Sequence, residues 1–437
     1  MPPGYTSRFG PINVPDPIRL GLASLAHLAG DPPPPPMPQA RSPAAGPRRR
    51  VLLLPLLLLP LLLLLHLASS PRSLPASRNP DARLQACEYS AGEWVPDASA
   101  GSSLRYDHTC KEIFKGWNCI ANGKANGRAL LRWRWKPTSG CDLPRLDPLR
   151  FLERHRNTNI GFVGDSLNRN MFVSLVCMLR GASGEVRKWH PVGADRGFTF
   201  LRYNLTVAYH RTNLLVRYGR WSASPNGGPL ESLGYKQGYR VDVDIPDQTW
   251  AEASSFHDIL IFNTGHWWWA PSKFDPIQSP MLFFEKGKPI IPPLLPPAGL
   301  DLALQLMITF LNKAMKPNAV KFFRAQSPRH FEGGDWNEGG SCQRNQPLSL
   351  EEVEEFFSLD NNSTNGELRL VNQHMMKALE QSTFRVLDIT HMSKFRADAH
   401  PSTTGGKKHD DCMHWCLPGP TDTWNDLLAA NLEDVDR

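Results

Sequence analysis

The sequence has no cysteine before position 87, no internal repeat and no nucleic-acid-binding motif. Its lysines and arginines are mostly scattered, so the net charge of +7 does not indicate a nucleic-acid partner. That charge is compatible with an acidic ligand such as a sugar acid or a phosphate-bearing cofactor. No Gly-rich phosphate loop marks a nucleotide or coenzyme A site. These absences leave the function to be sought in short motifs.

Aromatic residues are scarce and prolines abundant near the N-terminus. Of the 40 prolines, 18 lie in residues 1–80, and Pro32 to Pro36 are consecutive. A segment of this composition cannot bury enough apolar surface to form a core. Residues 1–50 are therefore predicted to be a disordered cytoplasmic tail, and the folded part to begin near residue 85.

One long apolar run, residues 51–68, contains no Asp, Glu, Lys or Arg. It is just long enough to cross a bilayer as a helix, although Pro55 and Pro60 weaken that helix. The arginines directly before it favour a cytoplasmic N-terminus by the positive-inside rule. We therefore expect a single-pass type II signal anchor followed by a luminal stem, residues 69–86. A cleaved signal peptide is the alternative, but its n-region would be unusually long.

All eight cysteines follow this run, and their number is even. They are Cys87, Cys110, Cys119, Cys141, Cys177, Cys342, Cys412 and Cys416. In an oxidising lumen this indicates four disulfides, whose pairing the sequence does not reveal. Zinc binding by Cys412 and Cys416, which flank His414, is the alternative; no second cysteine pair has zinc-like spacing, so we expect no metal. Candidate N-glycosylation sequons begin at Asn204, Asn361 and Asn362.

The rest of the chain divides by pattern into two parts. Residues 87–150 are rich in cysteine and tryptophan with weak periodicity, which is typical of a disulfide-tied, loop-rich lobe. Residues 151–437 alternate apolar runs with helical patterns, which predicts an α/β fold with a mostly parallel sheet covered on both faces. Ligands bind such sheets at the carboxyl ends of strands, where Ser166 and Asn263 fall. The expected strands are 159–164, 258–263, 319–325 and 383–390, and the expected helices are 167–179, 300–315 and 365–382.

Ser166 stands in the stretch GFVGDSLNRN, between an expected buried strand and a helix. As an N-cap, it would accept a hydrogen bond from a backbone N–H of that helix. As a nucleophile, it would be exposed at the turn, where helix N–H groups can hold an oxyanion. The α/β-hydrolase elbow G-x-S-x-G is absent because Asn168 replaces its second glycine. A serine enzyme here would therefore belong to another class.

The stretch HDDCMHWCLPG, residues 409–419, contains a candidate acid and base. Asp411 and His414 are three residues apart, so the carboxylate can bond Nδ1 of the imidazole and leave Nε2 for a serine. Disulfides at the neighbouring cysteines would hold this loop in place. Asp410 is a rival orienting acid. A metal cluster of His409, Asp410, Asp411 and His414 is a weaker alternative.

A third stretch, FNTGHWWWA, follows another expected strand. Asn263 can donate its side-chain N–H₂ to an oxyanion, and Gly265 can bring a backbone amide close. Ordinary turn chemistry is the alternative. Tryptophans gather on the segments with candidate chemistry, where their rings suit sugar contact or packing equally well. They are Trp267, Trp268, Trp269, Trp415 and Trp424.

Together these stretches resemble the trichome birefringence-like proteins of plants, which are polysaccharide O-acetyltransferases. The resemblance covers about residues 87–430 and includes, in order, CEYSAGEWVPD, WNCIANGK, GFVGDSLNRN, FNTGHWW, SPRHFEGGDWNEGGSC and DCMHWCLPGPTDTWNDLL. It implies an SGNH- or GDSL-like three-layer α/β/α sandwich with a minor lobe. It also implies a Golgi type II membrane protein that acetylates a cell-wall polysaccharide, most often xylan.

The resemblance assigns the nucleophile to Ser166 and the acid and base to Asp411 and His414. It implies transfer of an acetyl group through an acetyl-serine to a sugar hydroxyl. The donor, acetyl-CoA or another, would be a co-substrate, and no bound cofactor is expected. A luminal carbohydrate acetylesterase and a non-catalytic polysaccharide-binding protein are the alternatives. The residues that match its motifs as oxyanion or substrate groups are Arg169, Asn170 and Asn263.

Overall fold

The part of the chain that the structure, a computed structural model, describes begins at Cys87. The described ranges are 87–97, 105–191, 193–269, 274–275, 277–359 and 365–435. The predicted tail 1–50, anchor 51–68 and stem 69–86 lie outside these ranges, as do Asn361 and Asn362. No helix within the described ranges combines the length and the apolar character that crossing a membrane requires.

The centre of the fold is a seven-stranded sheet in the order β13-β12-β9-β3-β6-β5-β4. The strands from β13 to β6 run parallel, and β5 and β4 extend one edge through antiparallel pairs. The mostly parallel sheet that the sequence predicts is therefore confirmed. Its strands are β3 (Asn159–Gly164), β4 (Val186–Trp189), β5 (Arg196–Phe200), β6 (Leu205–Arg211), β9 (Ile259–Phe262), β12 (Val320–Arg324) and β13 (Arg385–Leu387).

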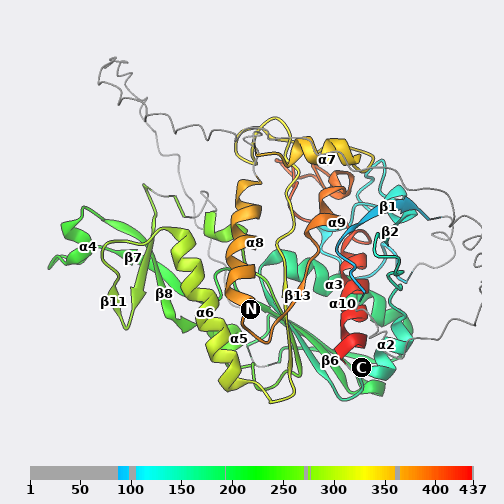
Figure 1. Cartoon of the computed structure of the whole chain (residues 1–437), viewed down its shortest axis with the longest axis horizontal. Coiled ribbons are helices and arrows are strands. Elements are labelled where there is room, and N and C mark those ends of the chain that lie inside the picture. Colours follow the sequence, from blue (N-terminus) through cyan, green and yellow to red (C-terminus); the bar gives the residue numbers. More distant parts are fainter. Residues whose placement is uncertain are drawn as a thin grey trace, which may run out of the picture. The chain divides into compact units, whose positions relative to one another are not determined.

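Helices cover both faces of this sheet, and the strand sequences show why. In β3, Phe162 packs into the core with α3, whereas the next residue, Val163, packs into the core with α6. Successive residues of a strand point to opposite faces, so apolar residues at both positions bury both faces. Figure 1 shows α3 and α10 together on one side and α6 and α8 on the other. The main helices are α2 (Pro148–Arg154), α3 (Ser166–Ala182), α6 (Pro296–Ala314), α8 (Gly366–Leu379) and α10 (Thr421–Val435).

A second sheet lies in a part of the chain for which the sequence pattern predicts no element. Its strand order is β11-β10-β8-β7, and it mixes parallel and antiparallel pairs. The strands are β7 (Val216–Ser222), β8 (Gln237–Pro246), β10 (Met281–Glu285) and β11 (Lys288–Pro289). Short helices complete the described part: α4 (Pro229–Ser232), α5 (Gln248–Ala251), α7 (Leu350–Phe356) and α9 (Thr390–Lys394).

The cysteine-rich segment before α2 is tied to the rest of the fold. It contains one antiparallel pair, β1 (Gly92–Pro96) with β2 (Trp133–Pro137). The four disulfides predicted from the cysteine count are present. They are Cys87–Cys141, Cys110–Cys177, Cys119–Cys416 and Cys342–Cys412. Trp117 and Trp135 of this segment share one hydrophobic core with Phe172 of α3. The segment is therefore a part of the same folded unit as the seven-stranded sheet rather than a body with a core of its own.

Candidate active site

Ser166 lies at the turn between β3 and α3. Gly164 ends the strand with φ of +146°, and a Cβ there would lie 1.9 Å from Oδ1 of Asn263, so this position requires glycine. Helix α3 begins at Ser166 and is capped by Asp165, whose carboxylate accepts from the N–H of Leu167 at 2.9 Å. The interpretation of Ser166 as an N-cap is thus wrong, because Asp165 has that role. The serine is half-buried, and its hydroxyl is not used to cap the helix.

That partner is His414. Its Nε2 lies 2.8 Å from Oγ of Ser166, and its Nδ1 lies 2.9 Å from Oδ1 of Asp411. Asp411 also accepts from the backbone N–H of His414 at 3.0 Å and from Nζ of Lys407 at 2.5 Å. Burial raises the pKa of Asp411, but His414 and Lys407 outweigh it and hold that pKa well below its usual range. The three predicted residues are thus brought together, and we call Ser166, His414 and Asp411 the triad.

Lys407 is a site residue that the sequence motifs did not single out. Its position four residues before Asp411 is a spacing at which oppositely charged side chains often pair. The rival acid Asp410 is bonded elsewhere, accepting from Oγ of Ser402 at 2.8 Å and from Nε2 of Gln343 at 3.0 Å. Both cysteines that flank His414 are in disulfides, which removes their thiolates as metal ligands.

Asn263 supports the turn that carries the serine. Its Nδ2 donates to Oδ1 of Asp165 at 2.9 Å, and its Oδ1 accepts from the Asp165 backbone N–H at 3.2 Å. Nδ1 of His266 lies 3.3 Å from Oδ2 of Asp165. Burial raises the pKa of Asp165, but His266, Arg324 and Asn263 together hold it well below its usual range. One hydrogen of the Asn263 amide is therefore used to position Asp165, and its role as an oxyanion donor stays a prediction.

The other predicted site residues have different surroundings. Asn170 is fully buried and bonds the backbone of Trp415. Its Oδ1 accepts from the Trp415 N–H at 2.8 Å, and its Nδ2 donates to the Trp415 carbonyl at 3.1 Å. This contact positions the loop of His414. The Arg169 guanidinium lies 4.7 Å from the ring centroid of Trp117, which in turn lies 5.3 Å from that of His414. Trp117 was missed as a site residue because its segment is far from the serine in sequence.

Gly265 allows a close backbone approach, since a Cβ there would lie 2.6 Å from Oε1 of Gln326. The five tryptophans differ in burial. Trp268, Trp415 and Trp424 are buried to within about 1% of full burial, so they pack the core. Trp267 and Trp269 are only partly buried and pack against that core.

Two buried histidines link the catalytic loop to the core. His400 Nδ1 donates to the His414 carbonyl at 2.7 Å, and His400 Nε2 lies 2.7 Å from His330 Nδ1. His330 Nε2 reaches the Lys394 carbonyl at 2.8 Å. Burial lowers the pKa of His330 to about 4, and burial with the neighbouring His330 lowers that of His400 well below its usual range.

This pair predicts that acid weakens the fold. An unfolded His330 takes up a proton near pH 6.5, whereas the folded one does so only near 4. The unfolded state binds more protons in this window, so the free energy of unfolding should fall by about 2 kcal/mol between pH 7 and pH 5 from this group. Urea unfolding of wild type and His330→Gln at pH 7 and pH 5 measures this change in the free energy of unfolding. The variant should be less stable at pH 7 and lose less on acidification; equal losses would contradict the prediction.

The role of Asp411 has a direct test. Asp411→Asn removes the charge that stabilises a protonated His414 and allows the wrong imidazole tautomer, so kcat should fall by roughly 10³-fold or more. The matched control is Asp410→Asn, one residue earlier and outside the triad, which should change kcat far less. The steady-state rates of both variants decide the matter, and equal losses would argue against Asp411 as the orienting acid.

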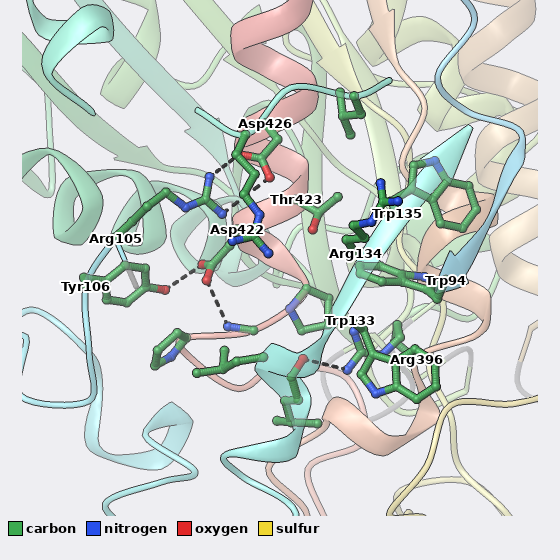
Figure 2. Close-up of a pocket in the computed structure, with 17 residues that line it drawn as sticks. Trp94, Arg105, Tyr106, Trp133, Arg134, Trp135, Arg396, Asp422, Thr423 and Asp426 are labelled. Atoms are coloured by element: carbon green, nitrogen blue, oxygen red, sulfur yellow. Dashed lines mark hydrogen bonds and ion pairs between the residues drawn. The ribbon is translucent and has the colours of Figure 1, made fainter. Parts of the chain in front are cut away.

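A separate hollow lies between β2 and the start of α10 (Figure 2). Four of its polar groups are paired within it: Arg105 is paired with Asp426, and Oη of Tyr106 donates to Asp422 at 2.6 Å. No triad residue is among the described residues that line it. This hollow is therefore a junction between the cysteine-rich segment and α10, and the chemistry lies elsewhere.

Comparison with known proteins agrees with this geometry. A family model described as PC-Esterase, a GDSL/SGNH-like acyl-esterase family found in Pmr5 and Cas1p, matches residues 143–431, and a PMR5 N-terminal domain model matches residues 85–142. The chain is 67% identical over 350 residues to the Arabidopsis thaliana protein trichome birefringence-like 13, covering 80% of this chain and 84% of that protein.

Two further Arabidopsis thaliana proteins extend the comparison. Identity to trichome birefringence-like 12 is 46% over 349 residues, covering 78% of this chain and 84% of that protein. Identity to xyloglucan O-acetyltransferase 2 is 31% over 357 residues, covering 80% and 83%. With its sheet, its four disulfides and both family models in place, the chain belongs to the PC-Esterase family and, within it, to the trichome birefringence-like proteins.

Proposed function

We propose that this protein is a polysaccharide O-acetyltransferase in which Ser166 is the nucleophile, His414 the general base and Asp411 the acid that orients the imidazole. The observation that carries the proposal is the continuous chain of hydrogen bonds from Ser166 Oγ through His414 to Asp411, at 2.8 and 2.9 Å. Such a chain activates a hydroxyl that is otherwise a weak nucleophile. An ordinary helix cap has no need of it.

In the first step, His414 Nε2 accepts the Ser166 proton while Oγ bonds the carbonyl carbon of the acetyl donor. The oxyanion lies at the first turn of α3, where the Ser166 N–H and the helix dipole favour negative charge. The bond to the leaving group then breaks, and the imidazolium returns its proton to that group. The products are acetyl-Ser166 and a neutral His414.

In the second step, the acceptor replaces the leaving group. His414 Nε2 takes the proton of a sugar hydroxyl as its oxygen bonds the acetyl carbon. The second tetrahedral intermediate collapses, the C–Oγ bond breaks, and the proton passes from His414 to Ser166. Asp411 stays ionised throughout, in keeping with its lowered pKa.

The acceptor that we propose is a plant cell-wall polysaccharide, with xylan and xyloglucan as the two candidates. Xylan follows from the family resemblance, and xyloglucan from the name of a relative at 31% identity. The four disulfides are typical of a protein that folds in the secretory pathway. We further propose a Golgi type II orientation and glycosylation at Asn204, which is exposed just before β6.

The experiment is mass spectrometry of the full-length chain incubated with an acetyl donor and either xylo-oligosaccharides or xyloglucan oligosaccharides. Acetylated oligosaccharide, together with a transient acetyl mass on the Ser166 peptide, is the expected result. Free acetate without acetylated sugar would instead favour a carbohydrate acetylesterase, the activity that the family's description suggests as an alternative. Glycan binding without any turnover would support the binding-protein alternative.

A further inference from the structure

Three arginines lie near the serine turn, on strands β5 and β6 and on helix α3. Tyr209 of β6 lies with its ring centroid 5.8 Å from that of Phe172, on the face that α3 covers. Arg211 follows two positions later in β6 and so points to the same face. Arg196 of β5 is directly opposite Tyr209 in the antiparallel pair, which also places it on that face. Arg169 comes to this place from α3.

The position of these arginines relative to the nucleophile follows from the strand register. Arg211 is aligned with Gly164, the last residue of β3 before the serine turn. Oη of Tyr209 donates to the carbonyl of Asp165 at 2.9 Å, so the tyrosine touches the residue next to Ser166. Arg169 is one helical turn beyond Ser166, where i and i+3 residues are neighbours. Arg196 and Arg211 therefore lie at the sheet edge where the serine turn begins, and Arg169 lies one helical turn into α3 from it.

The charges of this group are poorly balanced. One carboxylate contacts it: Oδ2 of Asp195 lies 3.8 Å from Nε of Arg196, and the Asp195 side chain is 39% exposed. In the described part of the chain, neither Arg169 nor Arg211 makes an ion pair with a carboxylate. Burial, together with repulsion from Arg196 and Arg211, lowers the pKa of Arg169. A protein gains nothing in stability from gathering like charges in this way, whereas an anionic ligand would relieve the repulsion.

We propose that Arg169, Arg196 and Arg211 form an anion-binding rim at the active site, which takes a carboxylate or phosphate group of a substrate. Guanidinium groups suit both, because their planar N–H donors match carboxylate and phosphate oxygens. This inference rests on the proposed function, because the ligand is taken to be one of the two substrates of that acetyl transfer. It adds that one of the two substrates is an acid: a uronic-acid-bearing glycan acceptor or a phosphate-bearing acetyl donor.

The test is isothermal titration calorimetry on the full-length chain, and it needs no turnover. The probes form two matched pairs that separate the two sources of negative charge. A uronic-acid-bearing xylo-oligosaccharide is compared with a neutral one of the same length. Coenzyme A, which carries no acetyl group and cannot react, is compared with pantetheine, which lacks its phosphates. Each titration is repeated at low and high salt.

The variants are Arg196→Gln and Arg211→Gln, with Arg202→Gln as the control. Arg202 is an exposed arginine at the opposite, amino end of β6. We expect one charged probe to bind more tightly than its neutral match, to weaken about tenfold with each rim variant, and to weaken as salt rises. Arg202→Gln should bind like wild type. The pair that shows the difference identifies the substrate that carries the charge.

Equal binding of charged and neutral probes, or no binding of any probe, would overturn the proposal, as would equal effects of Arg211→Gln and Arg202→Gln. Because the measurement is binding without reaction, it is independent of whether Ser166 acylates. An intact preference for the charged probe in a protein without transferase activity would retain the anion site and reject the proposed function. Acyl transfer without any preference for the charged probe would retain the proposed function and reject the anion site.

Discussion

Replacing Ser166 by alanine is expected to lower the acetyl-transfer rate by roughly 10⁴-fold or more, and to abolish the acetylated Ser166 peptide. The Ser166 hydroxyl is the group of the triad that forms the ester, and without it no acetyl-serine can form. The fold should survive, since Asp165 rather than Ser166 caps helix α3. Transfer assays with circular dichroism on the same samples measure both expectations.

The control for this substitution lies at the other end of the same helix. Ser183→Ala removes a hydroxyl that donates to the Arg180 carbonyl at 3.4 Å, far along α3 from the triad. Its transfer rate should be close to that of wild type. Activity that persists in Ser166→Ala would show that the serine is not the nucleophile, and the proposed two-step mechanism would then have to be abandoned.

Removing the Cys119–Cys416 disulfide is expected to have the largest effect on stability. The two cysteines are separated by 297 residues, so the bridge restricts the unfolded chain strongly. The chain-entropy model gives about 6 kcal/mol for such a loop. Cys416 is also two residues from His414, and the freed loop should hold the imidazole less well. We therefore expect Cys119→Ser/Cys416→Ser to lose both stability and kcat.

The matched control is Cys87→Ser/Cys141→Ser, which removes a bridge over 54 residues within the N-terminal segment. The same model gives about 4 kcal/mol for this shorter loop, but here no residue of the triad is near. Urea unfolding and transfer kinetics of both double variants separate the two effects. If both variants lose kcat alike, the Cys119–Cys416 bridge does not act through the His414 loop.

Much of the central fold follows from local pattern. The predicted strands at 159–164, 258–263, 319–325 and 383–390 all contain a strand of the sheet. Each is a short apolar run with turn residues after it, which is what burial on both faces requires. The predicted helices are confirmed as well, although α6 begins four residues earlier than expected, at Pro296. Proline is favoured in the first helical turn, because it lacks only an N–H that would be unpaired there.

The second sheet and the β4, β5 and β6 edge of the first could not be predicted in the same way. Strand β7 reads VRYGRWS, in which charged residues interrupt the apolar positions and most side chains are not buried, so the strand forms through its pairing with β8. Such pairing depends on partners distant in sequence, and β-propensity is strongly dependent on that context. The disulfide pairing has the same limitation, since Cys119 meets Cys416 only in the folded chain.

At the site, local sequence accounts for the separate units: a strand, a glycine turn and a helix that present Ser166, and a three-residue spacing that joins Asp411 to His414. These units meet only through the tertiary fold, since Ser166 and His414 are 248 positions apart in the chain. The tertiary fold also gave Asn170 and Asn263 their positioning contacts and gathered the three arginines. The reason is physical: spacing within one turn fixes a distance directly, whereas a distance between remote segments exists only once the sheet and core have packed.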